Sequence, residues 1–201
     1  MAISRAGRGG RDGSGGRAGD RLTPDVIVDA AAALVDDSGT AEVTLAAVAG
    51  RLGVATPSLY KHLDGLADLR ARLSVRTMTE MTAVFTDAVL GRSGDDAVRT
   101  LLHAFRDYVV RHPGRYAAMS PQPLRDPAQA EAGHRLIQVF LAVLRDYQLA
   151  DSDAIHYTRC ARALVHGFTS IETQGGFGLA EDLDETFERL VAMYLASLPR
   201  P

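Results

Sequence analysis

The sequence predicts an all-α protein with a small N-terminal domain and a larger C-terminal domain. Three observations support this fold class. From Thr23 onward apolar residues recur at helical spacing, no segment alternates apolar and polar residues as a half-buried strand does, and glycine or proline signals separate the segments. With 201 residues, of which 46% are hydrophobic and 23% charged, the chain can bury a sizeable core without cross-links.

The N-terminal end divides into a tail and a first helix. Residues 1–20 are rich in Gly and Arg and almost free of apolar side chains, so we expect a flexible basic tail. In the first helix, Thr23 is a candidate cap, Pro24 suits the first helical position, and Gly39 ends the segment. The other eight expected helical segments cover residues 44–53, 56–63, 66–90, 96–112, 114–120, 127–148, 152–173 and 182–198. We expect domains at residues 21–66 and 67–201.

Residues 44–63, TLAAVAGRLGVATPSLYKHL, fit the packing demands of a helix-turn-helix, whose second helix lies in the DNA major groove. Ala49 falls where the two helices cross closely, and Gly53 supplies a turn residue that can take a positive φ. Thr56 is a candidate cap of the second helix, and Pro57 pre-sets its first turn. The residues expected to close a small core are Val48, Leu52, Val54 and Leu59.

A helical hairpin in an ordinary bundle would also fit these features. The segment, with a capped helix before it and a long helix after it, nevertheless closely resembles the tetracycline-repressor (TetR) family of regulators. The family's pattern is matched at Thr44, Val48, Ala49, Gly53, Val54, Leu59, Tyr60, His62 and Leu63. The resemblance covers residues 23–70 strongly, and it covers the remainder through helix count and order.

The resemblance implies which side chains contact DNA. Those residues are Thr44, at a phosphate, and Thr56, Ser58, Tyr60, Lys61 and His62. Their chemistry fits, because hydroxyl groups and a lysine bind phosphate oxygens or base edges. His62 has an alternative role, packing against the first helix. Gly65 and Leu66 stand where the family commonly has Asn and Lys, so one phosphate contact is missing. The arginine-rich tail either reaches DNA in its place or stays in solvent.

The resemblance also implies that the last two helices form a dimer interface. An apolar stripe along residues 183–198 suits such an interface and equally suits a core. The candidate interface residues are His166, Gly167, Phe187, Leu190, Val191, Tyr194 and Leu198. His166 and Gly167 match a subgroup with a Trp-x-x-x-His-Gly signature, although Arg162 replaces its Trp. For His166, a ligand contact, a dimer contact and a buried core position remain open.

In this family the C-terminal helices enclose a ligand cavity, and Met and aromatic side chains are adaptable lining for a small, largely apolar effector. The candidate lining residues are Met78, Met81, Phe85, Phe105, Tyr108, Tyr116, Met119 and Phe140. The same side chains would serve equally well as an ordinary core.

The expected function is a homodimeric repressor that binds a palindromic double-stranded operator and releases it when the effector binds. No cofactor or metal is expected, and phosphate-loop, metalloprotease and serine-hydrolase motifs are missing, which disfavours an enzyme. The alternative is a helical interaction module that does not bind DNA. Residues 1–72 hold nine Arg or Lys and nine Asp or Glu, so the net charge of this part is zero and does not favour the DNA phosphates. The lone Cys160 and the lack of a long apolar run favour the cytoplasm and no membrane contact.

Overall fold

The computed structural model describes residues 22–40, 43–120, 122 and 125–200, and this part of the chain is all-α. The arginine-rich tail lies outside the described residues. The helices are α1 (Pro24–Ser38), α2 (Leu45–Leu52), α3 (Thr56–Leu59), α4 (Leu66–Val89), α5 (Gly94–Arg111), α6 (Pro113–Ala117), α7 (Pro127–Val143), the 3-10 turn η3 (Arg145–Tyr147), α8 (Asp151–Glu172) and α9 (Leu183–Ser197). The predicted order of nine helical segments is confirmed. Within the described ranges, no helix is long and apolar enough to cross a bilayer.

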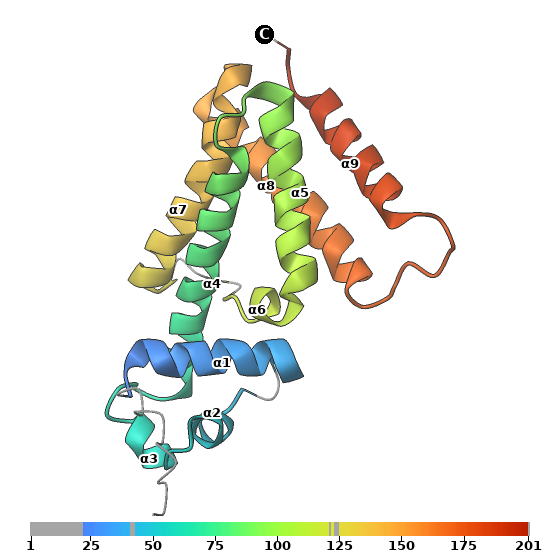
Figure 1. Cartoon of the computed structure of the whole chain (residues 1–201). Helices are drawn as coiled ribbons and strands as arrows, with labels where there is room; N and C mark the ends of the chain where they lie inside the picture. The colour runs from blue at the N-terminus through green and yellow to red at the C-terminus, as the bar shows by residue number, and fades with distance from the viewer. Residues whose placement is uncertain (1–21, 41–42, 121, 123–124, 201) are drawn as a thin grey trace, which may run out of the picture.

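The helices form two units that share one long helix. The first unit, made of α1, α2 and α3, lies at one end of the molecule, and α4 runs from it into the second unit (Figure 1). There α4 packs along α7 and α5, α5 contacts α8 and α9, and α9 lies at the outer edge (Figure 1). The first unit is therefore attached to the second through α4 and through the contact of α1 with α6.

Local signals in the sequence fix the helix ends near the N-terminus. The Thr23 hydroxyl accepts a hydrogen bond from the Val26 N–H at 3.3 Å, and the Thr44 hydroxyl accepts one from the Ala47 N–H at 3.1 Å. Both contacts satisfy N–H groups that have no partner inside the first helical turn. Gly53 ends α2 with φ 67° and ψ 28°, a left-handed conformation that favours glycine. The predicted role of Gly53 is confirmed.

Two apolar cores meet along α4. Leu69 and Leu73 are buried with the side chains of α1, α2 and α3, whereas Met81 and Phe85 are buried with those of the C-terminal helices. The domain boundary expected at residue 66 therefore falls at the start of a helix whose first two turns belong to the N-terminal core. A displacement at either end of this helix is transmitted along a rigid rod.

A second link between the units is the tight contact of α6 with α1. A Cβ atom added to Gly114 would lie 2.7 Å from Val35 Cγ1 and closer still to the Val35 carbonyl oxygen. Only glycine allows this approach without a shift of the backbone. Next to it, Arg115 makes ion pairs of 2.6 Å with Asp36 of α1 and 2.9 Å with Glu80 of α4. Arg115 thus joins three helices at the junction.

Glu80 is the centre of this polar junction. It accepts hydrogen bonds from Arg76 at 2.7 Å, from Arg115 at 2.9 Å and from the Tyr108 hydroxyl at 3.1 Å. Burial alone would raise the pKa of Glu80, but the hydrogen bonds and charges of the two arginines outweigh it and hold the pKa below its ordinary value. Glu80 therefore stays ionised near neutral pH, and both arginines keep a charged partner.

The apolar stripe of α9 faces the core of its own chain, which corrects the dimer-interface residues expected from the sequence. Phe187 and Val191 are 0% exposed, Tyr194 is 5% and Leu198 is 3%, so these side chains are not available to a second chain. Leu190 is half-buried and packs against the same core. The sequence pattern showed which face of α9 is buried, but it did not show that helices of the same chain cover this face.

Arg106 of α5 explains why this face turns inward. Its guanidinium pairs with Glu172 of α8 at 2.5 Å and with Asp184 of α9 at 2.7 Å, and it stacks over the Phe187 ring with its central carbon 5.0 Å from the ring centroid. Hydrogen bonds between charged groups are stronger than those between neutral groups, and a guanidinium over an aromatic ring adds a further attraction. Through them α9 is held against α5 and α8.

The contact at Gly114 gives a first prediction. Replacing Gly114→Ala should lower the free energy of unfolding by about 1 to 3 kcal/mol, because the new methyl group overpacks against the α1 backbone. Chemical denaturation measures the change. Gly133→Ala is the control, since a Cβ there meets only Met78 Sδ at 3.7 Å, an ordinary contact. Equal stability of the two variants would contradict the close approach.

Candidate functional site

The α2–α3 unit has the geometry of a helix-turn-helix. Val48 and Ala49 are buried on α2, Leu59 is buried on α3, and all three belong to the N-terminal core. The Val54 N–H donates to the Ala49 carbonyl at 3.0 Å, which closes the turn after Gly53. The expected close crossing at Ala49 fits its 1% exposure. The inner faces of both helices are therefore fixed by α1 and α4.

The recognition segment, residues 56–63, differs from the sequence expectation in its N-cap residue and in where its helix ends. Ala55, not Thr56, is the N-cap residue of α3, and no side chain caps this helix. The helix ends at Leu59 instead of Leu63, and His62 N–H bonds the Leu59 carbonyl three residues back at 2.9 Å. The Leu63 N–H bonds the same carbonyl at 3.0 Å, so the chain after Leu59 forms a hydrogen-bonded turn instead of a continued helix.

The described candidate DNA-binding residues lie on one exposed side of this segment. Leu59 and Leu63 are 0% and 3% exposed, which turns the residues between them outward. Tyr60 is 60% exposed and Lys61 is exposed as well. Of the remaining candidates, Thr44 is exposed, and Thr56, Ser58 and His62 are half-buried. The half-buried His62 is compatible with both of the roles expected for it.

The charged residues around this side leave Lys61 available to contact DNA. Arg51 pairs with Asp37 at 2.7 Å, and Arg72 pairs with Asp68 at 2.8 Å. Among the ion pairs between described residues, none includes Lys61 or Arg70. A cation without a protein partner loses no ion pair when it neutralises a phosphate, so Lys61 is the strongest candidate phosphate or base contact in the described residues.

Most of the residues expected to line a ligand cavity form solid core instead. Met78, Met81, Phe85, Phe105, Tyr108 and Phe140 are all 7% exposed or less. Phe85, Phe105 and Phe140 contact one another with ring centroids 5.4 to 6.1 Å apart, and none of the three main hollows is lined by any of the six. Sequence periodicity located these buried side chains, but the three aromatic rings pack against one another in tilted and edge-to-face contacts and form core instead of lining these hollows. Only Tyr116 and Met119 line a hollow.

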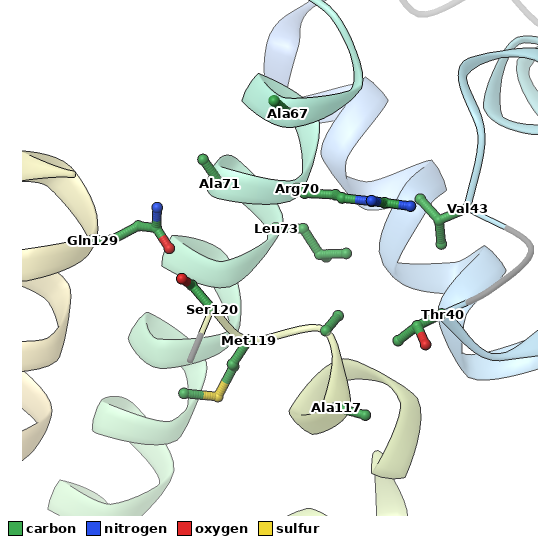
Figure 2. A pocket seen from close by; sticks show the side chains of 11 residues that line it. Thr40, Val43, Ala67, Arg70, Ala71, Leu73, Ala117, Met119, Ser120 and Gln129 are labelled. Carbon is green, nitrogen blue, oxygen red and sulfur yellow. The ribbon is translucent and has the colours of Figure 1, made fainter. Parts of the chain in front are cut away.

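One hollow, of about 540 Å³, lies at the junction of the two units. It is bounded by the α1–α2 connection, the start of α4, the end of α6 and the start of α7 (Figure 2). Arg70 extends across it toward Val43, whereas Gln129 and Ser120 lie on the other side of α4 (Figure 2). Its polar groups therefore do not converge on one point. A separate hollow, between α1, α4 and the start of α7, is lined by three aspartates and two arginines.

A second hollow, of about 350 Å³, lies entirely within the C-terminal unit, between α5, α6 and α8. We call it the α8 pocket. Its lining residues are Val109, Pro113, Tyr116, Ala117, Met119, Ser120, Arg162, His166, Thr169, Ser170, Thr173 and Gln174. Its size is at the lower end of the range for small-molecule sites. Ala117, Met119 and Ser120 also line the junction hollow, so one stretch of chain separates the two spaces.

His166 lies at the α8 pocket, which leaves a ligand contact or a dimer contact as its role. Its Nδ1 lies 3.1 Å from the Tyr116 hydroxyl of α6, and the two ring centroids are 5.7 Å apart. Burial raises the pKa of Tyr116, and the positive charge of nearby Arg162 opposes the rise only in part. Tyr116 is therefore a neutral hydroxyl near physiological pH. His166 is exposed and lines the pocket, so it is not a buried core histidine.

Sequence reasoning named Tyr116 and considered His166 but missed the other polar residues of this pocket. Arg162 was visible only as the residue in place of an expected Trp, and nothing in the pattern singled out Thr169 or Ser170. Arg162, His166 and Thr169 lie three or four residues apart, which places them on one side of α8. In the ranges that the structure describes, no group of three or more His, Cys, Asp or Glu residues is placed to hold a metal ion.

The chain matches two family models. One, of bacterial regulatory proteins of the tetR family, matches residues 27–73, and the other, of the tetracyclin repressor-like C-terminal domain, matches residues 98–194. The chain is 34% identical to YobS of Bacillus subtilis, an uncharacterised HTH-type transcriptional regulator, over 88% of this chain and 93% of the relative.

Solved structures share the fold. A protein of unknown function from Rhodococcus sp. RHA1 is 18% identical, with a TM-score of 0.78 over 90% of this chain and 97% of that one. A TetR variant from Acinetobacter baumannii AYE, solved in complex with minocycline, is 17% identical, with a TM-score of 0.68 over 88% and 96% of the two chains.

Proposed function

Because the chain belongs to the TetR family of regulators and is a transcriptional regulator with a helix-turn-helix DNA-binding domain, we propose that it is a repressor released from its operator by a small molecule. The observation that carries this proposal is the exposed pair Tyr60 and Lys61 on the recognition segment, held outward by the buried Leu59 and Leu63. The proposed DNA contacts are Thr44, Thr56, Ser58, Tyr60, Lys61 and His62. We place the DNA-binding unit at residues 21–73, since the first two turns of α4 share its core.

We propose that two chains assemble through α8 and α9, using residues other than the apolar stripe. Cys160, Ala163, Gly167 and Ile171 are exposed and follow one side of α8 at spacings of three and four residues. On α9, Met193 is 68% exposed between Ala192 and Ala196. This side is apolar, small and uncovered in one chain, as a two-fold helix interface requires.

Gly167 supports the same assembly. A glycine within a helix costs about 1 kcal/mol relative to alanine, and nothing in the chain lies within 4 Å of a Cβ atom at this position. Packing inside one chain therefore does not require the glycine. A helix of a second chain that approaches α8 closely would require it. Two recognition segments then meet successive major grooves about 34 Å apart, which suits a palindromic operator.

We propose that α6 carries the effector signal to the DNA-binding unit. Tyr116 of α6 lines the α8 pocket, while Gly114 and Arg115 of the same short helix contact α1. A ligand that displaces Tyr116 therefore acts on α1 within one helical turn. By linkage, a ligand that binds better when α1 is shifted weakens operator binding by the same factor. The Acinetobacter protein of the same fold was solved in complex with minocycline, which supports a small-molecule effector for this chain.

The recognition segment gives a second prediction. Lys61→Ala should weaken operator binding. A loss of affinity that is uniform across DNA sequences, with a shallower salt dependence, would mark a phosphate contact. A sequence-specific loss of about 1 to 3 kcal/mol would mark a base contact. Fluorescence anisotropy with the DNA upstream of the protein's own gene measures both. The matched control is Arg135→Ala, a cation on α7 whose side chain is 69% exposed. Unchanged binding for Lys61→Ala and Tyr60→Ala would refute the helix-turn-helix assignment.

The uncovered side of α8 and α9 gives a third prediction. Gly167→Arg combined with Met193→Glu should convert the dimer to folded monomers and weaken operator binding, because both changes place charge in the proposed interface. Light scattering after size-exclusion chromatography reports the mass, and circular dichroism reports the folding. The control is Ile137→Glu on α7, a 38% exposed apolar residue outside the interface. A double variant that remains dimeric places the interface elsewhere.

A further inference from the structure

We infer that the α8 pocket binds a small monocarboxylate with a short apolar body; this inference rests on the proposed effector role of the pocket and specifies its ligand. The sequence favoured a largely apolar effector, on the expectation that Met and aromatic side chains line the cavity. The space that the structure provides has different chemistry. Its walls bring a guanidinium, an imidazole and a phenol hydroxyl together from two helices.

The charge of the pocket favours an anion. Among the described residues that line it, Arg162 is the formal cation and none is Asp or Glu. Glu172, farther along α8, is held by Arg106 at 2.5 Å and so is not available to Arg162. Between described residues, no ion pair includes Arg162. An arginine that lines a pocket without a protein carboxylate is suited to take one from a ligand, as two parallel hydrogen bonds.

The neighbouring groups supply further donors. The Tyr116 hydroxyl lies within hydrogen-bond distance of His166 Nδ1, and in the tautomer in which the hydroxyl donates, the Nε2–H can donate to a ligand oxygen. The Ser120 and Ser170 hydroxyl groups also line the pocket. One full positive charge with several neutral donors matches a single negative charge, and a doubly charged phosphate would remain half uncompensated.

The rest of the lining sets the body of the ligand. Val109, Pro113 and Met119 line the α5 and α6 side of the pocket, together with the ring of Tyr116. Apolar walls with a few placed polar groups are the usual composition of a small-molecule site, in which the polar groups orient the ligand. Its volume of about 350 Å³ suits a molecule of the size of benzoate or octanoate rather than a large polycyclic one.

Isothermal titration calorimetry of the full-length protein tests this inference without DNA. The ligands are benzoate and octanoate, with benzamide and octanamide as uncharged partners of the same shape. At least one acid should bind about tenfold more tightly than its amide, because a hydrogen bond to a charged group contributes more than one to a neutral group. Arg162→Ala should remove this preference, and Arg162→Lys should keep part of it. Arg159→Ala, an exposed arginine on α8 outside the pocket, should leave it unchanged.

Three outcomes would overturn the inference: equal binding of acid and amide, acid binding that survives Arg162→Ala, and no binding of either acid. A carboxylate that binds as expected but leaves operator affinity unchanged would support the ligand class and contradict the proposed effector role. The failures of the two proposals are therefore distinguishable. Circular dichroism of each variant checks that the fold is retained.

Discussion

The contact of Gly114 with the backbone of α1 is the constraint on which the rest of the molecule depends. Without a side chain at this position, α6 lies directly against Val35, and Arg115 can reach Asp36 and Glu80 from the same turn. The DNA-binding unit is thereby held at two places, by the continuous helix α4 and by α6. A unit held at two places does not rotate freely about α4, so its orientation depends on where α6 lies.

The position of α6 depends in turn on what surrounds Tyr116. Its hydroxyl bonds His166, and the chain just after it separates the α8 pocket from the junction hollow. The ligand proposed for the pocket would compete for the same hydrogen-bonding groups and contact the same wall. The continuous helix α4 is one connection between the two units. The geometry adds α6, which is shorter and touches both the proposed ligand site and α1. Packed cores have few alternative arrangements, so a small displacement there is not absorbed locally.

The sequence predicted the order of the helices and the turn at Gly53 well, because caps, glycines and helical spacing are local signals. It failed where the answer depends on which surface covers a helix. Val191 has the helical spacing expected of an interface residue, yet it is buried in the core of its own chain. Phe85 and Phe140 were expected to line a cavity but pack edge to face against one another. Periodicity shows that a side is buried, and only tertiary packing decides whether a core, a ligand or a second chain buries it.

The pocket residues were harder still to predict. Arg162 and His166 are polar residues on a helix whose spacing alone fits solvent, core or a site equally well. What distinguishes them is Tyr116, which lines the same pocket and whose hydroxyl lies 3.1 Å from His166 Nδ1 although the two residues are fifty positions apart in the sequence. Gly114 carries no side-chain signal at all, and its importance rests on the position of Val35. Contacts between distant segments of the chain are the information that one sequence read alone does not contain.

The central claim, that the DNA-binding unit responds to the α8 pocket through α6, is tested most directly by a double-mutant cycle of operator affinity. Thr173→Trp fills the α8 pocket from α8 without an added ligand, and Arg115→Ala removes the ion pairs of α6 with α1 and α4. In the otherwise unchanged protein, Thr173→Trp should weaken operator binding about 5-fold or more, the lower limit of a typical coupling between sites. In the Arg115→Ala background it should have little effect. The same loss of affinity in both backgrounds would show that the signal does not pass through α6.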